Sequence, residues 1–210
     1  MPTRFSYVRF VNITLFVACI SFMAFTAENL SLAQIQCTQQ SPMAASVWDQ
    51  RGQPHVNMTH IFCGQINGTK AEGFHYRTND LDPPSAQTRD YDPNSVPPFA
   101  RGVSVWNANT RQWVIKSLPS GKDHFFFFPT SDFPSQNNLV IALRKGYLQC
   151  GNIGPNINTL CLQKGKWSGQ QLNYDTNIFL TKEPNRRIIS AFPDRSGTCR
   201  ASPTVMVCSR

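Results

Sequence analysis

The sequence has few acidic residues, no internal repeat and, after its first 33 residues, no long apolar run. Only 12 Asp and Glu stand against 20 Lys and Arg, which gives a formal charge of +8. Without a second apolar run, no later stretch is long enough to cross a bilayer as a helix. The surplus of basic side chains favours a polyanionic partner, nucleic acid or an anionic surface, although solubility alone also accounts for it.

The first 33 residues have the pattern of a secretory signal. Arg4 and Arg9 form a basic start, and a mostly apolar run follows from Val11 to Ala27. Ser31-Leu32-Ala33 offers a small-x-small cleavage site, with Ala27 as a second candidate. A retained membrane anchor is the competing interpretation, but the run is short and polar residues interrupt it. We therefore expect an exported protein, extracellular or periplasmic, in which residues 34–210 form a single domain.

Cysteine is the next informative residue type. Removal of the signal takes away Cys19 and leaves an even number, which in an exported chain predicts disulfide bonds. Connectivity is open from sequence; short loops favour Cys150–Cys161 and Cys199–Cys208, with Cys37–Cys63 as the remaining pair. The six candidates are Cys37, Cys63, Cys150, Cys161, Cys199 and Cys208.

Hydrophobic patterns predict an α+β fold, mainly antiparallel sheets with a few helices. Residues 139–147 are the best helix, residues 43–48 could add a helical turn or two, and the proline-rich residues 80–98 indicate a loop. Strands are expected at 102–106 and 112–116, joined by a turn, and at 125–128, 147–150, 160–163, 178–181 and 187–192.

Two histidines, His60 and His75, flank the hairpin-turn signal Asn67-Gly68. If these two residues form the centre of the turn, His60 lies directly opposite His75 on the paired strand. One imidazole could then act as a base and the other as an acid on a group between them. A surface pair and a zinc site that adds Cys63 are the alternative interpretations.

Three motifs resemble the EndoU endoribonucleases, a family that includes the nidoviral uridylate-specific enzymes. His60-Ile-Phe-Cys-Gly-Gln, followed by Gly73-Phe-His75, resembles the family's His-x-Phe-x-Gly-Glu and Gly-Phe-His elements. Lys122, followed by Phe126-Phe-Phe-Pro129, is similar to the bacterial Lys-x-Ser-Thr-Phe-Phe-Pro block. Ser190-Ala-Phe-Pro193 is similar to the Thr-x-Tyr-Pro element near the end of the family's sequences.

The chain also departs from the family pattern. Gln65 stands where the family often has Glu, His124 occupies the region of the family's Ser/Thr, and Phe192 replaces the usual Tyr. The spacing from the lysine to the proline is one residue longer. The stretch before His60 is too short for the N-terminal helical lobe of the animal enzymes.

The resemblance implies an EndoU-like catalytic domain that cleaves single-stranded RNA, with a preference for uridine, by transphosphorylation to a 2′,3′-cyclic phosphate. His75 is our choice of general base and His60 of general acid, with Lys122 as the cation that stabilises the extra charge on phosphorus. Ser190 and Phe192 would bind the base by hydrogen bonding and stacking. Gly73 and His124 are further candidates for contact with the substrate.

No carboxylate-rich cluster lies near the histidines in the sequence, so we expect no required cofactor and Mn²⁺ as an activator at most. The function would be that of a toxin or of an enzyme that scavenges extracellular RNA, with room for an inhibitor or immunity protein as partner. Taken alone, Lys122 is typical of a solvated lysine, and Ser190 and Phe192 are typical of core residues. The alternative function is a secreted RNA- or glycan-binding module without catalysis.

Overall fold

The computed structural model describes residues 34–39, 46–167, 169–182 and 184–209, so the expected signal segment lies outside the described residues. This part of the chain is a mixed α and β structure made mostly of strands. It contains the helix α1 and two short helical turns, η1 and η2 (Thr78–Asp80). Within the described ranges, no helix is both long and apolar enough to cross a membrane.

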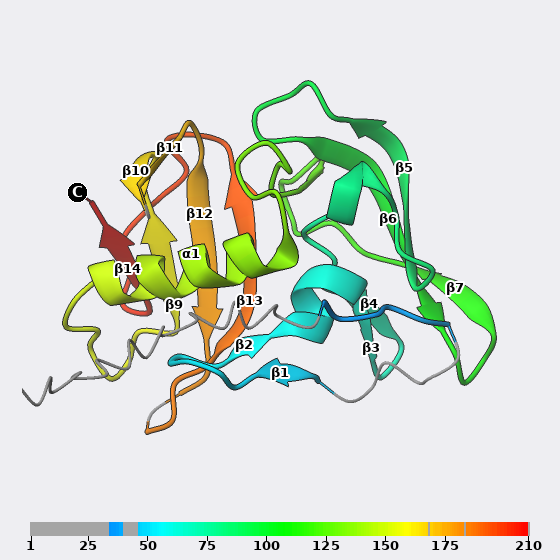
Figure 1. Ribbon diagram of the computed structural model, residues 1–210, viewed down its shortest axis with the longest axis horizontal. Helices are drawn as coiled ribbons and strands as arrows, with labels where there is room; N and C mark the ends of the chain where they lie inside the picture. The colour runs from blue at the N-terminus through cyan, green and yellow to red at the C-terminus, as the bar shows by residue number, and fades with distance from the viewer. Residues whose placement is uncertain (1–33, 40–45, 168, 183, 210) are drawn as a thin grey trace, which may run out of the picture. The chain divides into compact units, whose positions relative to one another are not determined.

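The larger sheet has six strands, and α1 (Gln136–Gln149) runs across one of its faces (Figure 1). Most neighbours are antiparallel, whereas the pairs β13–β2 and β14–β9 are parallel. Apolar side chains of α1 and of the sheet share one hydrophobic core. In spatial order the strands are β1 (Trp48–Asp49), β2 (Val56–Asn57), β13 (Ile188–Asp194), β12 (Asp175–Leu180), β9 (Thr159–Leu162) and β14 (Val205–Cys208).

Helix α1 confirms the predicted helix and extends it at both ends. The hydroxyl of Ser135 caps the N-terminus by accepting a hydrogen bond from the backbone of Asn138 at 3.2 Å. Leu139, Leu143 and Gly146 are buried and lie on one face of the helix, as the helical repeat requires. Because this repeat continues past residue 146, the strand predicted at 147–150 is wrong: the helix runs to Gln149.

A second sheet contains four strands and has its own, smaller core. The strands predicted at 102–106 and 112–116 do form a hairpin: they pair antiparallel, with Trp106 opposite Trp113. The loop predicted at 80–98 is wrong in part, because β5 forms between two proline clusters that bound the strand without interrupting it. The strands are β5 (Ala86–Asp92), β6 (Phe99–Asn107), β7 (Gln112–Ile115) and β8 (Phe125–Phe126), of which β8 also pairs with β6.

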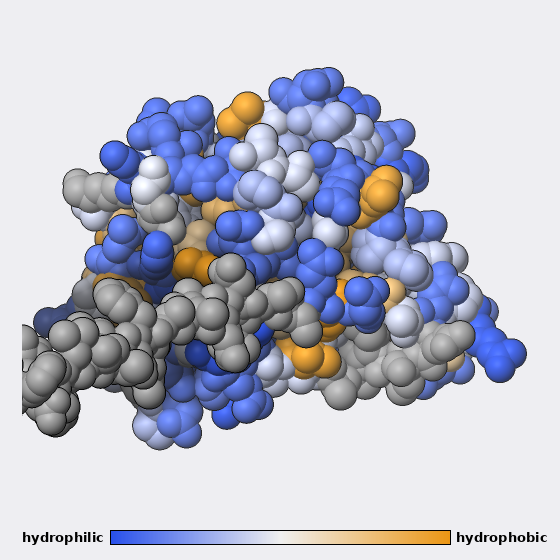
Figure 2. Space-filling model, viewed as in Figure 1, coloured by the Kyte–Doolittle hydropathy of each residue, from blue (hydrophilic) through white to orange (hydrophobic). Residues whose placement is uncertain are grey.

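The strands predicted at 160–163, 178–181 and 187–192 correspond to β9, β12 and β13. A small hairpin of β10 (Gly165–Trp167) and β11 (Gln170–Leu172) was not predicted. The helical turn expected at 43–48 lies largely outside the described residues, and Trp48 begins β1. On the face drawn in Figure 2, hydrophilic residues predominate and apolar ones appear in small separate groups.

Three disulfides link the six predicted cysteines, and only one of the expected pairs is correct. Cys37–Cys63 is confirmed. The structure pairs Cys150 with Cys208 and Cys161 with Cys199, so both predicted local bridges are wrong. One bridge joins the end of α1 to β14, and the other joins β9 to the segment after β13. Disulfides of this kind persist in oxidising compartments.

Candidate active site

The hairpin between the histidines forms one register away from the prediction. Strands β3 (Gln65–Asn67) and β4 (Lys70–Glu72) pair with Asn67 opposite Lys70, so Gly68 and Thr69 occupy the turn. A ladder in this register does not place His60 opposite His75. The predicted cross-strand pairing of the two histidines is therefore wrong.

The histidines nevertheless meet, because the chain leaves the ladder on both sides. His60 lies in the π-helical turn η1 (Thr59–Cys63), and His75 lies in extended chain after β4. The backbone N–H of His75 donates to the carbonyl of Ile61 at 2.8 Å, and that of Phe74 to the carbonyl of His60 at 2.7 Å. The two imidazole centroids are 5.7 Å apart, with the ring planes tilted by 31°. The prediction that the two rings share one small volume is confirmed.

Gly73 makes this approach sterically feasible. Its φ of +72° is a conformation that L side chains rarely adopt. A Cβ atom at this position would lie 2.1 Å from the carbonyl oxygen of His60. The segment that carries His75 can therefore pack against η1 only if residue 73 has no side chain.

Both histidines line a pocket of about 790 Å³ between the two sheets, larger than two other pockets of about 500 and 400 Å³. One wall comes from β4 and the segments around β7 and β8, and the other comes from β12 and β13. Every site residue expected from the sequence lies in this lining: His60, His75, Lys122, Gly73, His124, Ser190 and Phe192.

Strand β13 presents alternate residues to the pocket, as the period of two in a strand requires. Ser190, Phe192 and Asp194 all line it. The ring of Phe192 lies 5.3 Å from that of His75, centroid to centroid, and stacks on Phe179 of β12 at 5.5 Å. An aromatic surface thus adjoins the histidine pair.

Lys116 was missed by the sequence analysis, and it lies in the pocket beside both histidines. Its ammonium donates a hydrogen bond to the carbonyl of Gly73 at 2.7 Å. Burial lowers the pKa of Lys116 to about 7, and the negative charge of Glu72 opposes that effect. Strand alternation could have found it: Lys116 follows β7 on the same side as Val114, which packs against the second core.

The electrostatics of the histidine pair follow from burial next to a cation. Burial, with the charge of Lys116 as a smaller cause, lowers the pKa of His60 to about 4. The same two causes, and then His60 itself, hold the pKa of His75 well below its ordinary value. The buried Nδ1 atom of His60 has no hydrogen-bond partner among the described residues. Both imidazoles are therefore neutral near neutral pH in the free protein.

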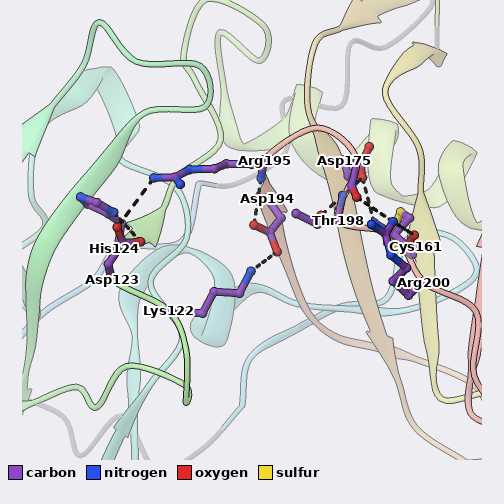
Figure 3. A network of polar contacts seen from close by, with 11 residues as sticks. Lys122, Asp123, His124, Cys161, Asp175, Asp194, Arg195, Thr198 and Arg200 are labelled. Carbon is purple, nitrogen blue, oxygen red and sulfur yellow. Dashed lines mark hydrogen bonds and ion pairs between the residues drawn. A yellow bond between two sulfur atoms is a disulfide. The ribbon is translucent and has the colours of Figure 1, made fainter.

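Lys122, in contrast, is paired. Its ammonium lies 2.7 Å from Oδ2 of the buried Asp194, across the pocket. The other oxygen of Asp194 accepts the backbone N–H of Arg195 at 2.8 Å. Beside them, Nδ1 of His124 lies 2.7 Å from Oδ1 of Asp123 (Figure 3). The His124 ring packs against Phe99 with centroids 4.0 Å apart.

The zinc alternative does not fit this arrangement, because Cys63 is oxidised in its bond with Cys37 and provides no thiolate. Over the described residues, no three His, Cys, Asp or Glu side chains gather as metal ligands.

Comparisons of the chain with family models, curated proteins and solved structures found no match.

Proposed function

We propose that this protein is an exported, EndoU-like endoribonuclease that cleaves single-stranded RNA at uridine and leaves a 2′,3′-cyclic phosphate. The observation that carries the proposal is the pair of buried, neutral histidines beside a buried lysine in a pocket with an aromatic wall. The EndoU motifs support it, because all of their predicted site residues line that one pocket.

The reaction requires a proton acceptor, a proton donor and a positive charge. A base takes the proton of the ribose 2′-hydroxyl, the 2′-oxygen forms a bond to phosphorus, and the bond from phosphorus to the 5′-oxygen breaks. An acid gives its proton to that leaving oxygen. A neutral imidazole serves as the base at neutral pH, and we assign this role to His75 and the acid role to His60.

The acid must be protonated, although burial beside Lys116 keeps His60 neutral in the free protein. A phosphodiester anion in the pocket adds negative charge beside the histidines, and a nearby opposite charge favours the protonated form of each base. Binding of substrate therefore raises the pKa of His60 and prepares it to donate a proton.

We assign the stabilising cation to Lys116, whose charge reaches both histidines. The assignment of this role to Lys122 stays a prediction, and the ion pair with Asp194 weakens it because that carboxylate already neutralises the lysine. Preorganised positive charge next to the reacting phosphorus stabilises the pentacoordinate transition state.

Base recognition falls to Ser190 and Phe192. Phe192 adjoins both His75 and Phe179, and the part of its half-buried ring that lines the pocket offers an aromatic surface for a base next to the reacting phosphate. Ser190 lies two residues earlier on the same face of β13, where its hydroxyl can hydrogen-bond a pyrimidine edge.

The test is cleavage of a uridine-containing oligoribonucleotide by wild type, His60→Ala and His75→Ala, with and without Mn²⁺. His55→Ala is the matched control, because His55 lines a different pocket. We expect products with a cyclic-phosphate end from wild type and the control only. Binding without cleavage by folded wild type would contradict the enzyme and support the alternative, a secreted RNA-binding module. Absence of both would reject an RNA function.

A further inference from the structure

Beyond the histidine pair, Lys122 and Asp194 line the cleft, and the exposed side chains of Asp123 and Arg195 lie next to them. Lys122 and Asp123 lie in the loop before β8, on one side, and Asp194 and Arg195 lie at the end of β13, on the other. Each side contributes one cation and one anion: Lys122 pairs with Asp194 at 2.7 Å, and Arg195 approaches Asp123 at 3.8 Å (Figure 3). We call these four residues the cleft clasp.

The two ion pairs of the cleft clasp differ in strength. Asp194 is buried, with 7% of its side chain exposed, and it bonds both Lys122 and the backbone of Arg195. Arg195 and Asp123 are exposed, with 59% and 69% of their side chains accessible. An exposed pair of this kind contributes little to stability. Asp194 therefore fixes the ammonium of Lys122 and the backbone of Arg195, whereas the guanidinium of Arg195 can exchange its partner.

Arg195 also has a defined orientation toward the cleft. Its guanidinium lies 5.6 Å from the ring centroid of Phe126, which lines the pocket. If Asp123 releases Arg195, its carboxylate keeps His124 as a partner at 2.7 Å. Because that carboxylate is exposed to water, an incoming anion can replace Asp123 on Arg195 without leaving a buried charge behind, and a guanidinium binds phosphate in a bidentate way.

From these contacts we propose that Arg195, supported by Lys122, binds a second phosphate of the RNA chain, next to the phosphate that is cleaved. The proposal rests on the proposed function. Arg195 directly follows β13 and lies three residues beyond Phe192, about 10 Å at the rise of a strand. Since the ring of Phe192 adjoins His75, a nucleotide bound beyond Phe192 would have its phosphate near Arg195. The substrate would then be a chain of several nucleotides and not a dinucleotide.

The experiment measures binding of fluorescent oligodeoxyuridylates, which lack the 2′-hydroxyl and cannot be cleaved by this chemistry. A hexanucleotide reaches Arg195 and a dinucleotide does not. Arg195→Ala is compared with Arg89→Ala, a matched control: Arg89 forms an exposed ion pair with Asp90 at 3.6 Å on β5, outside the pocket lining. Each protein is titrated at several salt concentrations.

We expect Arg195→Ala to weaken hexanucleotide binding roughly five- to tenfold, with a smaller loss for the dinucleotide, and to lower the salt slope by about 0.7. Arg89→Ala should change the affinity less than twofold. Asp123→Asn should tighten hexanucleotide binding, because it removes the competing anion. If the clasp only joins the two sheets, Asp123→Asn will instead lower the melting temperature as Arg195→Ala does and leave binding unchanged.

Equal losses for both ligands, or for both arginine variants, would overturn the proposal. Since binding is measured without cleavage, its failure can be told apart from failure of the proposed function. If wild type binds the hexanucleotide through Arg195 but cleaves no RNA, the phosphate site stands and the proposed enzymatic function is rejected. If wild type cleaves RNA but Arg195 contributes nothing to binding, the enzymatic function stands and the phosphate site is rejected.

Discussion

Basic side chains have opposite surroundings at the two ends of the cleft. At the inner end, Lys116 and two histidines are buried together, and the lysine bonds a neutral backbone carbonyl. At the cleft clasp, Lys122 and Arg195 each face a carboxylate. At the inner end burial outweighs the charge of Glu72 and lowers the pKa of Lys116, whereas direct pairing with a carboxylate favours the charged form of a basic group. The difference indicates that the inner end is built for an anion that arrives with the substrate, and the clasp for one that can be exchanged.

Removing the cation should have a large effect on cleavage at the inner end and a small one at the clasp. Lys116→Met should lower kcat/KM for RNA cleavage by roughly 10²–10³-fold, because the charge that stabilises the transition state is lost. Lys122→Met should lower it less than tenfold, mainly through KM, since Asp194 neutralises that lysine in the free protein. Steady-state cleavage by both variants makes the comparison. The reverse order would return the catalytic role to Lys122.

Gly73→Ala should break the inner end and leave the clasp intact. The new Cβ would meet the carbonyl of His60 at 2.1 Å, so either η1 or the segment of His75 must move. Gly68→Ala is the control, because Gly68 also has positive φ, but a Cβ added there would meet nothing within 4 Å in the described part of the chain. We expect Gly68→Ala to cost about 1–2 kcal/mol in unfolding free energy and to retain activity. Gly73→Ala should cost more and abolish cleavage; equal effects would contradict the packing argument.

The dependence of cleavage on pH should report Lys116. Its pKa of about 7 means that the charged form is present below pH 7 and is lost as pH rises. His60 must be protonated to act as the acid, and its pKa of about 4 means that kcat/KM already falls about tenfold for each pH unit above pH 4, since this ratio reports the free enzyme. Loss of the Lys116 charge should steepen that fall to about a hundredfold for each unit above pH 7. Lys116→Arg keeps its charge and should remove the steepening. A wild-type profile whose slope does not steepen above pH 7 would show that Lys116 is not the required cation.

The smallest expected effect is on stability. A lysine whose pKa is lowered on folding binds fewer protons in the folded state, so it makes the protein less stable below its unfolded pKa. Lys116→Met should therefore raise the unfolding free energy by about 1 kcal/mol at pH 7. The advantage should shrink as the pH rises toward 10.5, the ordinary pKa of a lysine. Denaturant unfolding of Lys116→Met and Lys122→Met checks this. A rise in unfolding free energy for Lys122→Met alone would contradict the expected difference between the two lysines.

Local patterns in the sequence predicted much of the fold, and the family resemblance predicted several residues that line the pocket. The β6–β7 hairpin follows from alternation around a turn, and α1 follows from its apolar face. The meeting of His60 and His75 was also predicted, but for the wrong reason. The Asn67-Gly68 signal cannot reveal that η1 interrupts the strand, since that turn depends on packing against residues distant in sequence.

Long-range contacts explain what the sequence did not reveal. The pairings Cys150–Cys208 and Cys161–Cys199 depend on which strands become neighbours, and loop length alone cannot rank them. Lys116 resembles any exposed lysine after a strand until the second sheet places it against Gly73. The environment of a charged group is a tertiary property, so its pKa and its role follow the fold.

The central claim is that the buried histidines are neutral in the free protein and gain a proton when a phosphodiester enters the pocket. The most direct measurement is an NMR titration of the ring nitrogens of His60 and His75, alone and with a non-cleavable 2′-deoxy oligonucleotide. We predict that both rings stay neutral in the free protein down to about pH 4, the pKa of His60, and that the ligand raises the pKa of at least one of them. Histidines that titrate near 6.5 in the free protein, or that ignore the bound ligand, would contradict it.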